Sequence, residues 1–449
     1  DRIPSHLPAM ASAAGGGAEA PSGSGPTAEV SAAPPPLAPA GAVKPLESCS
    51  QIGLDTLGAL TRLGEGSSAV IYKGVLPMGP GAGGEPDTRP PVAIKLAKSA
   101  EGQIKEDVDA ELRLLNTLAV VDPEDSTAGS YSSRHSRGAA YVIKLFGCGL
   151  HDGRRFMVLE YCPSTLEALL DIAVRPSHTR RASWFTAGFP RAPEMSLTRA
   201  FKIGFELCLA VDFLHSSAIP GCCVLHRDLK PSNVGLTATG HVRLMDMGLA
   251  RVVPRSLLDE SLEGDGSKKD GEGDREVRKL LPPYSMTGFT GSLRYMAPEV
   301  ALSKPYNETA DVHSLSHVLW EIVTLERPYK GFGKNTFYQR AVRQNERPAI
   351  DPTLPTEFSA LLTSCWDPSP QSRPPCAAMC ETMLQLVVEQ RYSETTTAEE
   401  QFSVEVPTSN LSFMPNLLGS GPTIRESRRG AEDIGSDGPS SPRAHHREA

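Results

Sequence analysis

One short loop of the sequence carries a carboxylate, an ammonium group and a side-chain amide between two apolar runs. Asp228, Lys230 and Asn233 lie in the stretch Val224-Leu-His-Arg-Asp-Leu-Lys-Pro-Ser-Asn233. Pro231 fixes one backbone angle and disfavours a continuous helix, so we expect a rigid loop. A carboxylate held there can accept a proton from a hydroxyl, an ammonium group can bind a phosphoryl oxygen, and an amide oxygen can bind a hard cation. These residue types together indicate phosphoryl transfer.

The order of residues in this loop resembles the catalytic loop of eukaryotic-type protein kinases, whose pattern is H-R-D-L-K-x-x-N. The matching residues are His226, Arg227, Asp228, Leu229, Lys230 and Asn233. An accidental match in a chain of this length has a chance on the order of 10⁻⁴, which disfavours an ordinary charged surface turn. The resemblance implies that Asp228 orients and deprotonates a protein hydroxyl, that Lys230 steadies the transferred group, and that Asn233 binds Mg²⁺ or Mn²⁺.

Composition argues against several other classes of protein. The 449 residues carry a net charge of −8 with both signs interspersed, so we expect no nucleic-acid partner. No run of eighteen apolar residues occurs, so we expect no transmembrane segment. The nine cysteines show neither a disulfide spacing nor a paired zinc motif, which favours reduced thiols and a cytoplasmic location, with a nuclear one also open. The sequence begins with Asp1 rather than Met, so a missing targeting segment stays open.

Composition also predicts how the chain is divided. Residues 1–48 and 391–449 are rich in small, polar or charged residues without apolar periodicity, and we expect two disordered tails. Between them, residues 49–390 fit one catalytic domain, with an N-terminal lobe at about 57–160 and a C-terminal lobe at about 164–390. Polar and glycine-rich stretches predict loop insertions within it, at residues 77–91, 121–139, 173–195 and 254–283.

Two strand-like runs joined by a glycine turn extend from Leu57 to Gly74. Such a turn can press its backbone amides against phosphate groups because no Cβ intervenes. A lone turn of this kind is weak evidence, and Ala69 stands where the kinase pattern has its third glycine. Its weight rises because Val92-Ala-Ile-Lys95 follows, and a lysine that ends an apolar run needs an anion nearby.

The next segment, Gln103 to Leu118, has helical periodicity and places Glu111 within its buried stripe. A rim glutamate that reaches solvent would have the same spacing. The kinase resemblance implies that Lys95 and Glu111 pair and orient the α- and β-phosphates of ATP.

Two further strand-like runs, Tyr141 to Phe146 and Phe156 to Tyr161, are expected to complete a small sheet. The resemblance makes Leu159 the residue that borders the nucleotide pocket and makes Glu160 to Cys162 the hinge that bonds adenine, although plain core packing would explain Leu159 and Cys162 equally well. Carried over position by position, the implied ATP-binding residues are Leu63, Gly64, Glu65, Gly66, Ser67, Ser68, Ala69, Ile71, Ala93, Lys95, Glu111, Leu159, Glu160 and Cys162.

A long helix is predicted from Leu197 to His215, with Phe201, Phe205, Leu209 and Phe213 on its buried face. It leads to the catalytic loop. Within residues 241–248, a strand-like alternation ends at Asp246, and Gly248 follows two residues later. The resemblance implies that Asp246 binds the metal ion together with Asn233, in a motif whose usual Phe is replaced by Met247.

Residues 287–299 resemble the end of a kinase activation segment, which closes with Ala-Pro-Glu299. The resemblance implies a structural pair between Glu299 and Arg373, and an aspartate, Asp311, that anchors the catalytic loop. Further helices are expected at about 335–343, 357–366 and 376–388.

Arg227 is the motivation for a regulatory prediction, because a guanidinium beside the catalytic carboxylate needs an anion. We expect a phosphate on Thr287 or Thr290, added by an upstream kinase or by self-phosphorylation, to supply that anion. The alternative is that Arg227 binds a backbone carbonyl instead.

The sequence therefore predicts an α+β fold, the bilobal protein kinase fold, with a small antiparallel sheet and one long helix in one lobe and a larger, mainly helical second lobe. The resemblance to serine/threonine kinases rests on Lys230 and Ser292. The resemblance to the tyrosine-kinase-like group among them rests on Leu-Trp-Glu321 and on the stretch from Cys365-Trp366 to Arg373-Pro374. The expected activity transfers the γ-phosphate of Mg-ATP to a Ser or Thr hydroxyl of a protein. The alternative is a pseudokinase scaffold, which Ala69, Met247 and Gly235 leave open; Gly235 in particular would leave the floor of the adenine pocket unfilled.

Overall fold

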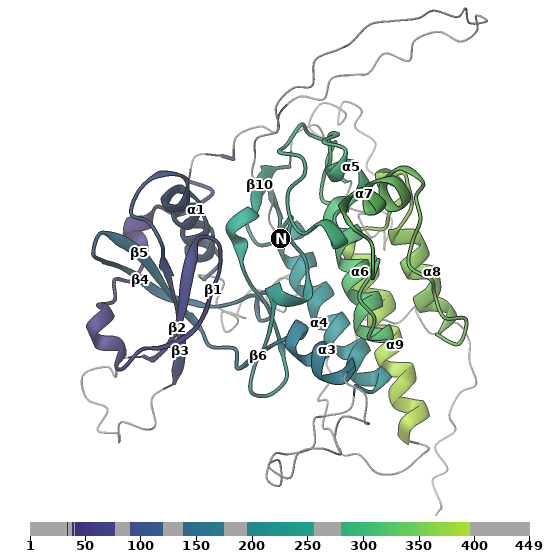
Figure 1. Cartoon of the computed structure of the whole chain (residues 1–449), viewed down its shortest axis with the longest axis horizontal. Helices are drawn as coiled ribbons and strands as arrows, with labels where there is room; N and C mark the ends of the chain where they lie inside the picture. The colour runs from purple at the N-terminus through teal and green to yellow at the C-terminus, as the bar shows by residue number, and fades with distance from the viewer. Residues whose placement is uncertain are drawn as a thin grey trace, which may run out of the picture. The chain divides into compact units, whose positions relative to one another are not determined.

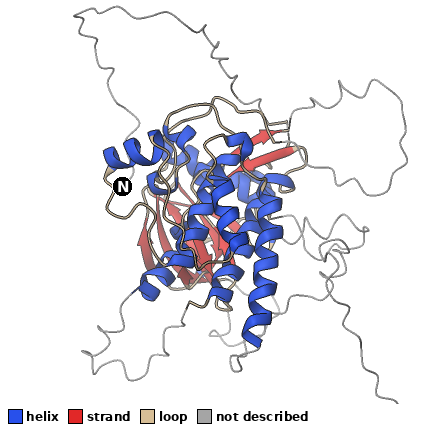
Figure 2. Ribbon diagram, turned by 90° about the vertical axis from the view of Figure 1, so that its right-hand side faces the viewer, coloured by secondary structure: helices blue, strands red, loops and turns tan. Residues whose placement is uncertain are grey.

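A computed structural model of the chain describes residues 41–76, 90–119, 138–174, 195–255 and 280–395, together with residues 34, 38 and 39. The interiors of the four expected insertions and most of the two expected tails lie outside these ranges. The described residues form the predicted bilobal α+β kinase fold, with a strand-rich N-terminal lobe and a helix-rich C-terminal lobe (Figures 1 and 2).

The N-terminal lobe is built on a five-stranded antiparallel sheet in the order β1-β2-β3-β5-β4. Its strands are β1 (Thr61–Glu65), β2 (Ala69–Val75), β3 (Pro91–Ala97), β4 (Leu145–His151) and β5 (Arg154–Glu160). Successive side chains of a strand point to opposite faces. In β3, Val92, Ile94 and Leu96 therefore join an apolar cluster on one face, while Lys95 points to the other, toward helix α1.

Helix α1 (Gly102–Leu118) packs on that second face. Its apolar residues Val108, Leu112 and Leu115 recur at helical spacing and are buried in the main core. Glu111 lies among them and is buried too. The helix therefore brings a carboxylate to the sheet face on which Lys95 lies.

The C-terminal lobe is mainly helical, as Figure 2 shows by the long blue helices. Its helices are α3 (Leu166–Val174), α4 (Leu197–Ser216), α5 (Pro298–Ala301), α6 (Thr309–Thr324), α7 (Lys334–Phe337), α8 (Thr356–Cys365) and α9 (Cys376–Thr395). A π-helical turn, η8 (Tyr338–Arg343), follows α7 directly. Small sheets pair β6 (Ser164–Thr165) with β8 (Val234–Leu236) and β9 (Val242–Leu244), and β7 (Cys222–Leu225) with β10 (Arg251–Pro254).

Short helical turns complete the described chain. They are η1 (Leu46–Ser48), η2 (Leu54–Leu57), η5 (Pro231–Asn233), η6 (Met247–Leu249), η7 (Leu293–Tyr295) and η9 (Pro370–Ser372). Two of them, η5 and η6, lie within the stretches that the sequence marked as chemically active. No helix in the described ranges combines the length and the apolar character that crossing a membrane requires.

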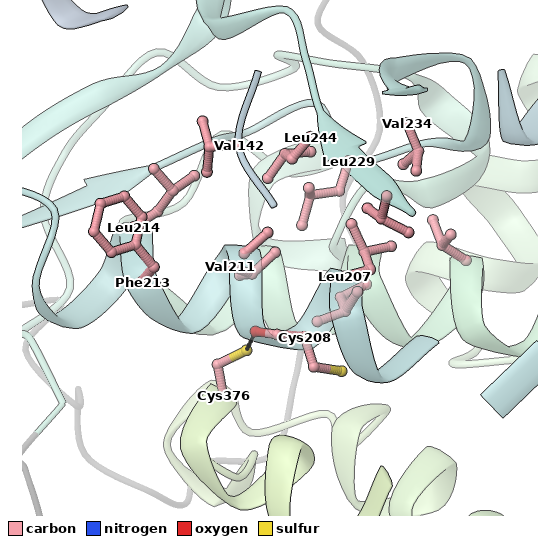
Figure 3. Close-up of a cluster of buried hydrophobic side chains, with 14 of the residues drawn as sticks. Val142, Leu207, Cys208, Val211, Phe213, Leu214, Leu229, Val234, Leu244 and Cys376 are labelled. Carbon is pink, nitrogen blue, oxygen red and sulfur yellow. Dashed lines mark hydrogen bonds between the residues drawn. The ribbon is translucent and has the colours of Figure 1, made fainter. Parts of the chain in front are cut away.

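Helix α4 forms the centre of the C-terminal core (Figure 3). Ser196 caps its first turn, because the hydroxyl accepts a hydrogen bond from the Arg199 amide at 3.2 Å. The predicted buried face was too narrow. Leu207, Val211 and Leu214 are buried as well, whereas Phe205 and Leu209 are only half-buried, because strands and α9 cover different sides of the helix.

Several predicted boundaries need correction. Residues 141–144 form no strand apart from one bridge between Val142 and Leu244, and β4 begins only at Leu145. Within the predicted N-terminal tail, residues 41–48 are packed against the lobe, and Leu46 is buried. At the other end, α9 continues five residues beyond 390, to Thr395. The expected insertions also lose residues at their edges, since Pro91, Gly138, Val174 and Pro254 belong to packed or regular structure.

A buried ion pair joins Glu299, at the start of α5, to Arg373, which follows η9. Arg373 donates from Nη1 and Nη2 to the two carboxylate oxygens of Glu299, at 2.6 and 2.9 Å. The Arg373 side chain is 0% exposed and that of Glu299 is 7% exposed. Arg373 also donates to the carbonyl oxygens of Thr309 and Asp367. The guanidinium thus ties three segments together.

We predict that Arg373→Ala lowers the free energy of unfolding by about 3–5 kcal/mol, because it leaves the Glu299 carboxylate buried without a cation. Denaturant unfolding of the full chain measures this. Arg340→Ala is the matched control, because Arg340 and Glu346 form an exposed pair whose loss should change little. Equal unfolding midpoints for Arg373→Ala and the wild-type chain would contradict the prediction.

Candidate active site

The catalytic-type loop between β7 and η5 is fixed from beneath by one buried carboxylate. Asp311, on α6, accepts hydrogen bonds from the backbone amides of His226 (2.7 Å) and Arg227 (2.8 Å). It also accepts one from the His215 imidazole at 2.9 Å. Burial alone would raise the pKa of Asp311, but the His215 hydrogen bond and nearby positive charge outweigh it and lower that pKa. An ionised carboxylate therefore holds the loop.

Asp228, Lys230 and Asn233 converge on this loop. The Lys230 ammonium donates to Asp228 Oδ2 at 2.8 Å, and the Asn233 amide nitrogen donates to the Asp228 carbonyl and carboxylate at 2.8 and 3.1 Å. Ser292, from the activation segment, donates from its hydroxyl to Asp228 Oδ1 at 2.9 Å and accepts from Lys230 at 3.0 Å. A serine hydroxyl thus lies between a carboxylate that can take its proton and an ammonium group beside its oxygen.

A second charge cluster joins the two lobes. Lys95 donates to both carboxylate oxygens of Glu111 at 2.7 Å and to Asp246 at 3.0 Å. Burial opposes the charge of Lys95, but Glu111 and Asp246 outweigh it, so the pKa of Lys95 is raised. Burial would also raise the pKa of Asp246, yet the adjacent Lys95 ammonium lowers it. Both groups are charged at neutral pH.

Asn233 and Asp246 have the oxygen chemistry that a Mg²⁺ or Mn²⁺ ion requires. The amide nitrogen of Asn233 is already used toward Asp228, which leaves its carbonyl oxygen as the acceptor. Asp246 is ionised, has a left-handed backbone with φ of 61°, and keeps its side chain about one-third exposed. The backbone amide of Met245, the residue before Asp246, donates to the backbone carbonyl of Asn233 at 2.8 Å and so holds Asn233 and Asp246 close together. The donor set fits a hard divalent cation.

Met247 follows Asp246 and is buried in the same core as Val108 and Leu112 of α1. Its backbone also bonds Glu111. The methionine therefore fills the space beneath α1, in keeping with the adaptable shape of an unbranched thioether.

The glycine turn forms between β1 and β2, where the Gly66 amide bonds the Ala69 carbonyl at 2.9 Å. A Cβ at Gly64 would meet nothing within 4 Å, and one at Gly66 would meet only a carbonyl at 3.7 Å. Ala69 is buried, so its methyl group packs within the lobe. Leu63 is 48% exposed, an apolar side chain left uncovered at the turn.

The expectation of an open floor at Gly235 is wrong. A Cβ at this position would lie 2.6 Å from the Cys162 sulfur and 2.8 Å from the Met245 sulfur, so these two side chains already occupy the space. Arg243, which pairs with Gly235 between β8 and β9, donates a hydrogen bond to Glu160 at 2.7 Å. Burial raises the pKa of Cys162 to about 12, so its thiol is neutral.

Arg227 binds a backbone carbonyl, which was the alternative to the hypothesis that it binds a phosphate. Its Nε donates to the Leu249 carbonyl at 2.7 Å, and its Nη1 donates to the Tyr306 hydroxyl at 3.0 Å. That hydroxyl donates in turn to the Thr287 carbonyl at 2.9 Å. Tyr306 therefore links Arg227 to the segment that carries Thr287 and Thr290.

A family model of the protein kinase domain matches residues 59–392. The fold and the two charge clusters agree with this match, and the chain belongs to the protein kinase family.

Curated relatives carry matching names. A probable serine/threonine-protein kinase, drkC of Dictyostelium discoideum, is 27% identical over 74% of this chain and 35% of its own length. Serine/threonine-protein kinase STY17 of Arabidopsis thaliana is 31% identical over 42% of the chain and 27% of its own. Dual specificity protein kinase shkD of Dictyostelium discoideum is 28% identical over 52% of the chain and 25% of its own. The matches thus cover about a third or less of each relative.

Sequence reasoning missed two residues of this site, Tyr306 and Met245, and one contact of a residue that it had named, Cys162. Tyr306 gave no signal, because no sequence pattern links a tyrosine at this position to Arg227. Met245 was overlooked, and Cys162 was assigned to the hinge but not to the floor, because Gly235 was considered without the side chains that fold over it. Each contact depends on packing between distant segments.

We predict that Gly235→Leu lowers the free energy of unfolding by about 1–3 kcal/mol, because the added side chain overpacks against two sulfurs. Thermal unfolding of the full chain measures the loss. Cys162→Ala in the same chain removes the nearest sulfur and should recover part of it.

The matched control for this prediction is Gly333→Ala, since a Cβ at Gly333 meets nothing within 4 Å. If Gly235→Leu melts at the wild-type temperature, the sulfurs do not fill the floor.

Proposed function

We propose that this chain is an ATP-dependent protein serine/threonine kinase of the tyrosine-kinase-like group. The observation that carries the proposal is the hydroxyl of Ser292, bonded to Asp228 and Lys230 at 2.9 and 3.0 Å. A substrate alcohol needs the same two partners, a carboxylate for its proton and a cation near the oxygen that attacks phosphorus. The position favours an aliphatic hydroxyl, which reaches the carboxylate without the bulk of a phenol ring.

The residues of the chain would divide the reaction among them. Lys95, held by Glu111, would bind phosphate oxygens, and Leu63 would cover the base from the glycine turn. Asp228 would orient the substrate hydroxyl and take its proton, while Lys230 would offset the charge that develops on the transferred group. Asn233 and Asp246 would hold Mg²⁺ or Mn²⁺, which when bound neutralises phosphate charge. No step needs a covalent intermediate on the protein.

A pseudokinase scaffold is the second candidate, and two observations count against it. The departures at Ala69 and Met247 are each accommodated by packing, and the floor at Gly235 is filled by Cys162 and Met245. The residues to which the mechanism assigns phosphate, metal and proton roles also keep their expected types and contact one another. They are Lys95, Glu111, Asp228, Asn233 and Asp246. The relatives' names include both serine/threonine and dual specificity kinases.

One experiment tests the activity and the specificity together. The full chain is incubated with Mg-ATP and a peptide library in which the acceptor is Ser, Thr or Tyr, beside an Asp228→Asn control. Phosphate transfer to Ser and Thr, absent in the control, supports the proposal. Transfer mainly to Tyr would replace it with a dual specificity or tyrosine kinase, and no transfer at all would favour the scaffold.

We predict that Asp246→Asn lowers kcat at least 100-fold without changing the melting temperature, because this partly exposed residue acts on metal and phosphate rather than on the core. Lys95→Met should lower kcat as far and should also lower the melting temperature, because Glu111 then lies buried without its cation.

Adding Glu111→Gln to Lys95→Met provides the control for this prediction. The double variant should recover stability and not activity, as measured by thermal unfolding beside steady-state kinetics. Near-normal turnover in Asp246→Asn would show that the metal-binding role is wrong.

We also predict that phosphorylation at Thr287 or Thr290 raises activity about tenfold. A phosphate on this segment could pair with the Arg227 guanidinium in place of the present link, in which Arg227 donates to Tyr306 and Tyr306 donates to the Thr287 carbonyl. One charge-assisted hydrogen bond contributes about 1.5–3 kcal/mol, enough to shift the ordered population by that factor. The test compares kcat for the phosphorylated chain and the phosphatase-treated chain, with each state verified by mass spectrometry. Equal rates would mean that Tyr306 alone is sufficient to order the segment.

A further inference from the structure

Residues 42–57, which we call the strap, lie before the part of the chain that matches the protein kinase family and yet pack on its N-terminal lobe. Leu46 and Cys49 are buried in the core beneath α1. Leu57 is fully buried in the cluster on the opposite face of the sheet, beside Ile94 and Phe156. The strap therefore passes from one face of the sheet to the other around the edge formed by β4.

The first part of the strap holds the C-terminal end of α1. The Lys44 amide donates to the Thr117 hydroxyl at 2.8 Å. The Asn116 side chain donates to the Ser48 hydroxyl at 2.8 Å and to the Pro45 carbonyl at 3.4 Å. Asn116 is 8% exposed. If the strap left α1, the Asn116 amide would therefore lose these partners without gaining full access to water.

The middle of the strap lies along β4, and the sequence of β4 is fitted to it. The Cys148 amide donates to the Ser50 carbonyl at 2.9 Å, and the Ile52 amide donates to the Cys148 carbonyl at 2.8 Å. A Cβ at Gly147 would lie 2.5 Å from the Ser50 carbonyl oxygen, and one at Gly149 would lie 2.4 Å from that of Ile52. Only glycine at these two positions leaves room for the strap's backbone.

The attachment to α1 matters because of where Glu111 lies. Asp109 accepts a hydrogen bond from Arg155 of β5 at 2.9 Å, and Asn116 is bound by the strap. These residues are seven apart, about two turns and about 10 Å along one side of the helix. Glu111 lies between them. One fixing point belongs to the kinase domain and the other comes from outside it.

We propose that the strap positions helix α1 for phosphotransfer, with Asn116 as the positioning residue that keeps Glu111 against Lys95. The proposal rests on the proposed function in that Glu111 must orient Lys95 for ATP. It assigns the segment before the kinase domain a role in setting activity: when the strap leaves β4, the end of α1 is released and the ion pair with Lys95 weakens.

The test uses two full-chain variants that release the strap from opposite sides, Asn116→Ala on α1 and Gly147→Ala on β4. Arg113→Ala, an exposed position on the same helix, is the matched control. Hydrogen exchange is followed at the amides of residues 102–118 without nucleotide, beside kcat, KM for ATP and KM for peptide. The same substitutions are also made in a Glu111→Gln chain.

Both variants should exchange faster in α1 than the control and leave exchange in α4 and α6 unchanged. They should lower kcat/KM for ATP about fivefold to tenfold, with KM for peptide unchanged. Neither should lower kcat/KM further in the Glu111→Gln chain, since the strap acts through that residue. Gly147→Ala tests the idea independently if Asn116→Ala folds poorly, and the reverse also holds.

The proposal is overturned if α1 exchanges at the wild-type rate in both variants, or if exchange rises equally in α4 and α6, because the strap would then support the fold as a whole. An equal further loss of activity in the Glu111→Gln chain would also overturn it. A wild-type chain that transfers no phosphate refutes the proposed function, whereas the exchange measurement still decides whether the strap holds α1.

Discussion

A single buried carboxylate, that of Asp311, determines the geometry on which the active site depends. It lies on α6 in the core of the C-terminal lobe and accepts the amides of two successive loop residues and the His215 imidazole. Three donors offset the cost of burying its charge. Because the bonds go to backbone, they fix the path of the loop, including Arg227 at a φ of 65°. The direction of Asp228 follows from that path.

The two charge clusters are joined through Asn233, which uses both its side chain and its backbone. Asn233 bonds Asp228 through its side chain and Met245 through its backbone, and Met245 precedes Asp246. Asp246 then reaches Lys95 on the sheet of the other lobe. A displacement of α1 would therefore change the position of the Lys95 ammonium before it changed the catalytic loop. The proposed effect of the strap would reach the site by this route.

Sulfur and tyrosine side chains take over tasks that the sequence pattern assigns to other groups. Cys162 and Met245 close the space above Gly235, and the thioether of Met247 fills the region beneath α1. Tyr306 bridges Arg227 to the Thr287 carbonyl, so a tyrosine hydroxyl links the catalytic loop to this segment. Each of these residues differs in type from the one that the pattern predicts but fills a similar volume or makes a hydrogen bond. Packing tolerates such a change because the neighbouring side chains contact a shape and a polarity rather than a particular residue type.

The sequence alone determined the types and order of the reactive residues, and the resemblance of these short motifs to those of protein kinases predicted the bilobal α+β fold. Local periodicity predicted most helices. The resemblance to protein kinases, rather than the spacing alone, predicted that Lys95 and Glu111 pair, and the structure contains that pair. The tertiary structure alone decided that β4 starts at Leu145, that Cys162 and Met245 fill the space beside Gly235, and that residues 42–57 are hydrogen-bonded to α1. Those features depend on contacts between segments far apart in the chain, such as Lys44 with Thr117, which no local pattern records.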